Sequence, residues 1–286
     1  MPQSFKSKTL RYIGLNRGER ERVTLFPVSL VFLLLAFAAA RGIAVPQSTR
    51  TPALEETWLA EGSQALARGD AVAAEAAFRR ALAVDPHSVG ILNDLAIALV
   101  QQKKTAEAIP LYQRALALRP GDPTTTRNLA IAYFREQRYR SALPLFKSLT
   151  RKMPGDFQAA SLTGLSLFAL NRYVEAAQYL DRASRIKPSD LPTLYMLGQA
   201  DLRDKNFGAM TGVFARISKL APDSAEADVM MGTAYDKAFQ EQSAIEEYQA
   251  AEKADPNFPG VHSGLGLLYW KRGDTQRAKA EFQQEL

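Results

Sequence analysis

The 286-residue chain contains no cysteine and only two histidines, His87 and His262. The lack of cysteine excludes disulfides, thiolate metal sites, cysteine nucleophiles and a lipidated cysteine. A site built from several histidines is not expected with only two in the chain. We therefore expect no metal ion and no cofactor. His87, in a turn after Pro86, and His262, on a helix, are both expected at the surface.

Signatures of catalysis are also lacking. The sequence has no Walker loop, HExxH motif, EF-hand loop or nucleophile elbow. Gly264-Leu265-Gly266 is only a fragment of a dinucleotide fingerprint, and no strand is expected before it. The acid pairs Glu55-Glu56 and Glu246-Glu247 have no candidate base beside them. We therefore expect a protein that is not an enzyme.

The net charge of +6 is confined to the N-terminal segment. The first 50 residues hold eight Lys or Arg and two acidic residues, so residues 51–286 sum to zero. A basic surface for nucleic acid would need the charge on the folded body, and no nucleic-acid partner is expected.

The N-terminal segment divides into a basic tail, 1–24, and an apolar stretch, 25–45. Residues 25–40 read LFPVSLVFLLLAFAAA, sixteen positions without a charge, and six basic residues precede them. As a helix they span about 24 Å, less than the ~30 Å core of a bilayer. The charge asymmetry predicts export across the cytoplasmic membrane, either through a signal peptide or with a retained membrane anchor reaching Val45. The repeats would then be periplasmic, secreted or anchored outside the cytoplasm, after a linker at 46–54.

A strict period of 34 residues organises the rest of the chain. Six prolines mark it: Pro86, Pro120, Pro154, Pro188, Pro222 and Pro256. An alanine or methionine lies twelve positions before each proline, and a large apolar residue lies eight before. Glycine or alanine lies twenty-four before. Such a unit predicts two packed helices, because the small residues let the backbones approach and proline ends the second helix. Asp122, Asp70, Asp274 and Thr105 are candidate N-caps.

The 34-residue unit, the opening Trp58…Gly62 and the Ala…Phe/Tyr…Ala…Pro rhythm resemble tetratricopeptide repeats. This resemblance implies an all-α, right-handed superhelical α-solenoid of about seven helix-turn-helix units. The units are expected at 55–88, 89–122, 123–156, 157–190, 191–224, 225–258 and 259–286. The pentatricopeptide RNA-binding array repeats at 35 and fits less well. In the fifth unit, Asp201, Met210 and Gly212 depart from the pattern, which predicts looser packing or a ligand there.

The family resemblance also implies a concave groove lined by the first helices. The expected groove residues are Asn93, Ile97, Val100, Arg127, Ile131, Phe134, Leu165, Phe168, Tyr195, Gln199 and Leu202. Their apolar middle suits an amphipathic helix or an extended apolar segment. Packing between adjacent first helices is the alternative role for these side chains.

These observations favour a non-catalytic scaffold or adaptor for a protein or peptide ligand. Two alternatives remain open. The repeats are the substrate-recruiting region of an enzyme whose catalytic domain lies beyond Leu286, or they form a homo-oligomer. The second rests on charge, since residues 121–188 carry a net +6 and residues 223–256 a net −7.

Overall fold

The computed structural model describes residues 52–285, and within them every regular element is an α-helix. The predictions for the basic tail, for the apolar segment and for linker residues 46–51 lie outside this range. No helix in the described part of the chain is long and apolar enough to cross a membrane.

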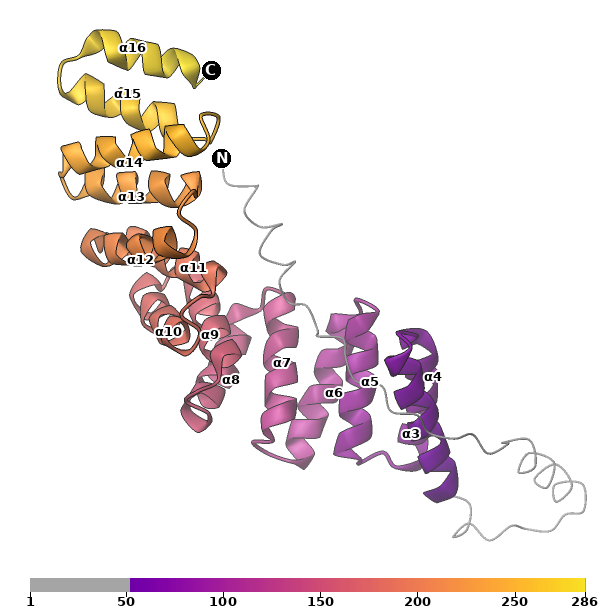
Figure 1. Ribbon diagram of the computed structural model, residues 1–286. Helices are drawn as coiled ribbons and strands as arrows, with labels where there is room; N and C mark the ends of the chain where they lie inside the picture. Colours follow the sequence, from indigo (N-terminus) through magenta and orange to yellow (C-terminus); the bar gives the residue numbers. More distant parts are fainter. Residues whose placement is uncertain (1–51, 286) are drawn as a thin grey trace, which may run out of the picture. The chain divides into compact units, whose positions relative to one another are not determined.

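The helices, labelled in Figure 1, belong to two compact units. The first ends at Lys103 and contains α3 (Pro52–Ala67), α4 (Ala71–Val84) and α5 (Val89–Gln101). The second begins at Lys104. Its helices are α6 (Thr105–Leu118), α7 (Pro123–Arg135), α8 (Tyr139–Lys152), α9 (Phe157–Ala169), α10 (Tyr173–Ile186), α11 (Leu191–Arg203), α12 (Phe207–Leu220), α13 (Ala225–Lys237), α14 (Glu241–Ala254), α15 (Val261–Lys271) and α16 (Thr275–Gln284).

The helices end where the periodic prolines predict. Each of α4, α6, α8, α10, α12 and α14 stops two residues before its proline, because the residue before proline is disfavoured in the α conformation. Asp122 caps α7 as expected, and its carboxylate accepts the Thr125 N–H at 2.8 Å. Asp70 and Asp274 cap α4 and α16 in the same way.

Two boundary predictions are wrong. Thr105 is the first residue of α6 and not its cap, which is Lys104 without a side-chain hydrogen bond. Helix α3 begins at Pro52, inside the expected linker. Proline suits the first position of a helix because its missing N–H would have no partner there.

The turns between paired helices share one backbone conformation. A residue with positive φ recurs every 34 positions: Gly69, Lys103, Gln137, Asn171, Lys205, Phe239 and Gly273. In most of these turns the next N–H bonds back to a carbonyl in the last turn of the first helix, as from Arg138 to Tyr133 at 2.8 Å. This is the left-handed helix ending that glycine favours, and only two of the seven positions hold glycine.

Close contact between helix pairs depends on the small residues. A side chain at Gly198 would place its Cβ 2.3 Å from the ring of Phe214, and one at Gly62 would meet Phe78 at 2.5 Å. Phe78 and Phe214 are fully buried as a result. The small residue in the first helix therefore makes room for the large residue of the second helix, and the two pack closely together.

Within the second unit, each hairpin packs on the next in chain order (Figure 1). The second helix of one hairpin contacts the first helix of the following one, as α12 contacts α13 and α14 contacts α15. The last hairpin leaves Leu267, Trp270 and Phe282 exposed. Tyr248, which corresponds to Phe282 one repeat earlier, is buried because Gly264 of the next hairpin lies against its ring.

The fifth repeat is not loosely packed. Met210, Phe214 and Ile217 are fully buried in a core that includes Leu180 and Leu194 of the preceding hairpin and helix α11. Asp201 is 4% exposed, so a carboxyl group occupies the place of the usual aliphatic or aromatic residue.

Candidate binding surface

The predicted groove residues lie on the first helices of successive hairpins. Within the second unit these helices adjoin one another, since α9 contacts α11 and α13 contacts α15. The residues in question are half-buried: Arg127, Ile131, Phe134, Leu165, Phe168, Tyr195, Gln199 and Leu202. Each side chain thus has one part packed in the array and another open to solvent.

In the first unit, helix α5 carries three of the predicted residues. Asn93 is 8% exposed, and its amide donates to the Val89 carbonyl at 2.9 Å. Ile97 and Val100 are half-buried. Asn93 is therefore mainly a structural side chain of its own helix, while Ile97 and Val100 retain exposed apolar surface.

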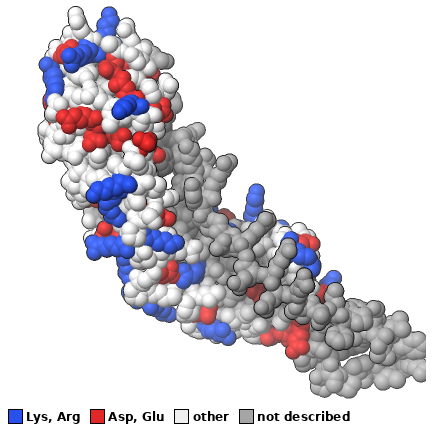
Figure 2. Space-filling model, viewed as in Figure 1, with Lys and Arg blue, Asp and Glu red and all other residues white. Residues whose placement is uncertain are grey.

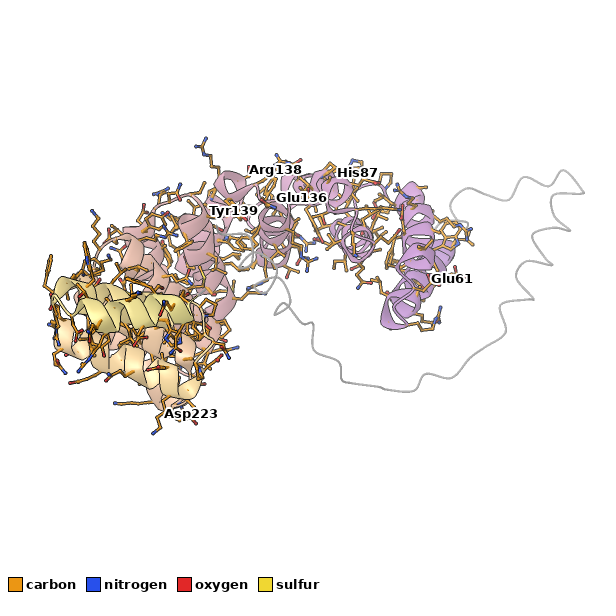
Figure 3. All side chains as sticks on the ribbon, turned by 90° about the horizontal axis from the view of Figure 1, so that it is seen from above. Glu61, His87, Glu136, Arg138, Tyr139 and Asp223 are labelled. Carbon is orange, nitrogen blue, oxygen red and sulfur yellow. The ribbon has the colours of Figure 1, made fainter. Side chains whose placement is uncertain are left out.

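Two aromatic pairs form the middle of the surface in the second unit. The rings of Phe134 and Tyr139 meet edge to face, with centroids 5.3 Å apart, and those of Phe168 and Tyr173 repeat this contact at 5.3 Å. Tyr139 and Tyr173 are the first residues of α8 and α10. Figure 3 shows Tyr139 beside Arg138 at the turn that joins α7 to α8. Burial raises the pKa of the Tyr139 phenol, which keeps it neutral.

Tyr139 and Tyr173 are not among the groove residues predicted from the sequence. Tyr139, Tyr173 and Phe207 are 34 residues apart, each as the first residue of a second helix. The recurrence of an aromatic residue at the start of the second helix could have revealed them. In two repeats this residue lies five positions after the aromatic residue of the groove, on the other side of the turn between the two helices.

Arg127 takes part in the junction between two hairpins. Its guanidinium lies 2.5 Å from the Asp156 carboxylate and 3.5 Å from the Gln158 side-chain oxygen. Burial opposes ionisation of Asp156, but hydrogen bonds from Arg127 and the Ala159 N–H outweigh it, so the pKa of Asp156 is lowered. Arg127 therefore holds the capped start of α9.

The surface becomes more polar along α11 and α13. The Tyr195 hydroxyl is 2.8 Å from the Ser224 hydroxyl, and the Tyr195 ring contacts Phe214 at 5.9 Å. On α13, the Asp236 carboxylate forms an ion pair with the Lys271 ammonium group at 2.5 Å. An apolar stretch on α7 and α9 is thus followed by hydroxyl and charged groups.

Charge changes sign along the second unit. Residues 121–188 hold 11 basic and 5 acidic side chains, whereas residues 223–256 hold 2 basic and 9 acidic. Figure 2 shows acidic side chains gathered towards the C-terminal hairpins and basic ones nearer the middle of the chain. Arg140 and Arg172 line one shallow pocket on the basic stretch.

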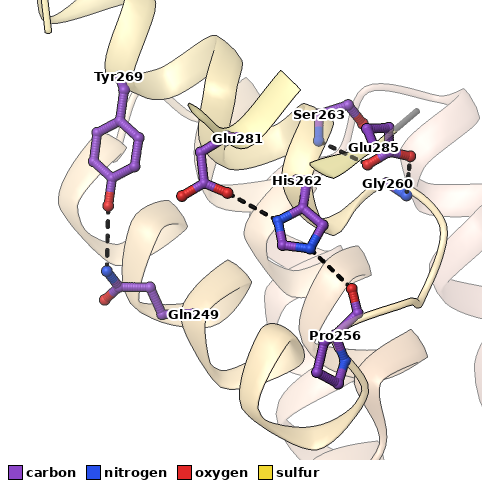
Figure 4. A network of polar contacts seen from close by, with 8 residues as sticks. All are labelled: Gln249, Pro256, Gly260, His262, Ser263, Tyr269, Glu281 and Glu285. Atoms are coloured by element: carbon purple, nitrogen blue, oxygen red, sulfur yellow. Dashed lines mark hydrogen bonds and ion pairs between the residues drawn. The ribbon is translucent and has the colours of Figure 1, made fainter. Parts of the chain in front are cut away.

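A separate polar cluster joins the last three helices (Figure 4). His262 is only 5% exposed, so its expected surface position is wrong, whereas His87 is exposed as expected. The His262 ring contacts Glu281 at 2.8 Å and the Pro256 carbonyl at 2.9 Å. The hydrogen bond to Glu281 raises the pKa of His262, against the opposing effect of burial. A carboxylate oxygen of Glu252 lies within 4.8 Å of the facing atoms of His262 and Glu281.

Three family models match the chain, each described as a tetratricopeptide repeat or TPR repeat. They cover residues 59–123, 99–165 and 242–273. The chain contains tetratricopeptide repeats. Outside these stretches the same alternation of paired helices continues through the described hairpins. Repeats of this kind are generally non-catalytic scaffolds. The sequence matches no curated protein.

Solved structures share the fold of the tetratricopeptide array. MamA from Desulfovibrio magneticus RS-1, residues 41 to the end, is 26% identical with a TM-score of 0.53, over 58% of this chain and 94% of that one. The C-terminal part of a TPR repeat-containing protein from Cytophaga hutchinsonii is 15% identical with a TM-score of 0.64, over 79% and 93%. YrrB, described as a TPR protein with an unusual peptide-binding site, is 19% identical with a TM-score of 0.57, over 69% and 97%.

Proposed function

We propose that this protein is a non-catalytic scaffold that binds an apolar peptide or amphipathic helix on the first-helix surface of its second unit. The supporting observation is the repeated pair of half-buried rings, Phe134 with Tyr139 and Phe168 with Tyr173. Edge-to-face packing fixes these rings before a ligand arrives, so little side-chain entropy is lost on binding.

The neighbouring side chains define the ligand. Ile131 and Leu165 extend the apolar surface on α7 and α9, whereas the Tyr195 hydroxyl and Gln199 on α11 offer hydrogen bonds. The preferred ligand would have apolar residues at one end and polar residues at the other. A helix presenting residues at i, i+3, i+4 and i+7 fits such a surface.

A peptide selected from a displayed library of amphipathic segments would test this surface. Its affinity would be measured by calorimetry with the native chain, with a Phe134→Ala/Phe168→Ala double variant and with Phe239→Ala. Phe239 is 93% exposed in the α13–α14 turn, so its removal controls for the loss of a surface aromatic. We expect the double variant to lose at least tenfold in affinity, since aromatic anchors dominate such interfaces, and the control to bind normally. Equal binding by all three proteins, with unchanged circular dichroism, would contradict the proposal.

We further propose that the N-terminal segment exports the array or anchors it outside the cytoplasm. The support is the run of sixteen uncharged residues behind six basic ones. Cell fractionation with N-terminal sequencing provides the test. A mature chain beginning after Ala40 or Ala44 indicates a cleaved signal, and an intact chain in the membrane fraction indicates an anchor. An intact chain in the cytoplasmic fraction would contradict export.

A further inference from the structure

Three consecutive helices each contribute one metal-ligating side chain to the cluster at the C-terminal end of the array. Glu252 lies on α14, His262 on α15 and Glu281 on α16. One ligand atom from each lies within 4.8 Å of the other two. Two ligand atoms of a tetrahedral zinc ion are about 3.4 Å apart, since each lies about 2.0–2.2 Å from the metal. Small side-chain rotations are therefore enough to bring all three onto one ion.

The contacts of His262 fix the role of each ring nitrogen. The Pro256 carbonyl can only accept, so Nε2, at 2.9 Å, must be the donor. Nδ1 then faces the Glu281 carboxylate at 2.8 Å (Figure 4). At 2.8 Å this contact is a hydrogen bond through a proton on Nδ1, so a metal ion would have to replace that proton and the two atoms would have to move to about 3.4 Å apart. A metal-bound histidine commonly donates its other N–H to a backbone carbonyl in this way.

The formal charge of the three side chains suits a divalent ion, because a neutral imidazole with two carboxylates balances two positive charges. Residues 223–256, which include Glu252, carry 9 acidic and only 2 basic side chains. Glu285 is not a further ligand, because its two oxygens accept the Gly260 and Ser263 N–H groups at 3.1 and 2.9 Å.

We propose that Glu252, His262 and Glu281 bind one divalent transition-metal ion, of which zinc is the best match. Imidazole and carboxylate ligands suit zinc, and water completes its four-coordinate shell. The expectation of no metal site counted histidines alone, and it overlooked carboxylates that reach the same histidine from two neighbouring helices. The bound ion would tie α16 to α14 and α15, and so stabilise the α15–α16 hairpin.

Titration of metal-free full-length protein with zinc tests the site. Binding would be followed by calorimetry at neutral pH after removal of metal with a chelator. The informative variants are His262→Gln and Glu252→Gln. Glu252→Gln leaves the contacts of His262 with Glu281 and Pro256 in place, so it keeps the local fold. The matched controls are His87→Gln, which removes the other histidine, and Glu246→Gln, an exposed acid on the same helix α14.

We expect the native chain and both controls to bind one zinc ion with equal affinity. His262→Gln and Glu252→Gln should bind at least about tenfold more weakly. Zinc should also raise the melting temperature of the native chain but not of Glu252→Gln, since a ligand stabilises only a state that binds it. No zinc binding at micromolar concentrations would overturn the proposal. Equal binding by Glu252→Gln and Glu246→Gln, or loss of binding in His87→Gln, would also overturn it.

Discussion

At the scale of single residues, Asp201 is the clearest departure from the repeat pattern. Burial raises the pKa of this carboxyl from 3.8 to about 6, with smaller contributions from Asp204 and Asp181. The folded chain therefore holds this proton more tightly than the unfolded chain does. The stability contributed by the neutral carboxyl is complete below pH 3.8 and is lost as the pH rises through about 6.

Asp201→Asn should therefore raise the free energy of unfolding at neutral pH by about 1–3 kcal/mol. The gain should disappear in acid, where Asp201 is protonated in both states. Urea unfolding of both proteins across this pH range measures the effect. Glu136→Gln removes an exposed acid and serves as the control, with little change expected. A gain for Asp201→Asn that is constant with pH would contradict the raised pKa.

Phe239 illustrates residue-scale strain in a turn. Its φ of 60° is left-handed, and the side chain is 93% exposed. Phe239→Gly should stabilise the protein by about 1 kcal/mol, because it relieves the clash of Cβ with the backbone. Asn171→Gly, at the same position two repeats earlier, should gain less because asparagine tolerates this conformation. Thermal unfolding of both variants checks the order, and an equal or smaller gain for Phe239→Gly would contradict it.

At the scale of the helical hairpin, the same substitution should have opposite effects at two places in one repeat. Gly198→Ala places a Cβ 2.3 Å from the Phe214 ring, so it should destabilise by about 1–3 kcal/mol. Gly212→Ala meets nothing within 4 Å on an exposed helical position, so it should stabilise by up to about 1 kcal/mol. Denaturant unfolding at constant slope measures both, and two changes of the same sign would refute the packing argument.

The sequence predicted the hairpins well because the signals that set them are local and repeated. Pro120 and Pro154 mark helix ends by their own geometry, and Asp122 caps α7 through a residue three positions away. The missed features depend on distant neighbours. The buried His262 contacts Glu281, nineteen residues away, and no periodic pattern in the sequence predicts that contact. Tyr139 and Tyr173, the partners of Phe134 and Phe168, do recur with the repeat. Their contact with the first helix could not be predicted, however, because it depends on the backbone geometry of the turn between the two helices.

At the scale of the whole molecule, the second unit carries opposite charge at two places along one chain. A second copy of the chain offers complementary charge to each, so weak head-to-tail association is expected at low ionic strength. Sedimentation velocity should show the association weakening as salt is added, because exposed charges are screened within about 10 Å at 0.1 M. Reversing Arg138 and Arg140 to Glu, both exposed, should abolish it. A mass independent of salt would contradict this association.

The exposed ring of Phe282 has a use in protein engineering. Phe282 corresponds to Tyr248 one repeat earlier, and Tyr248 is buried because Gly264 of the following helix lies against its ring. A grafted hairpin that begins with such a helix would find its docking site already shaped. The array can thus be lengthened in steps of one repeat, with each addition protecting the apolar face left by the one before it.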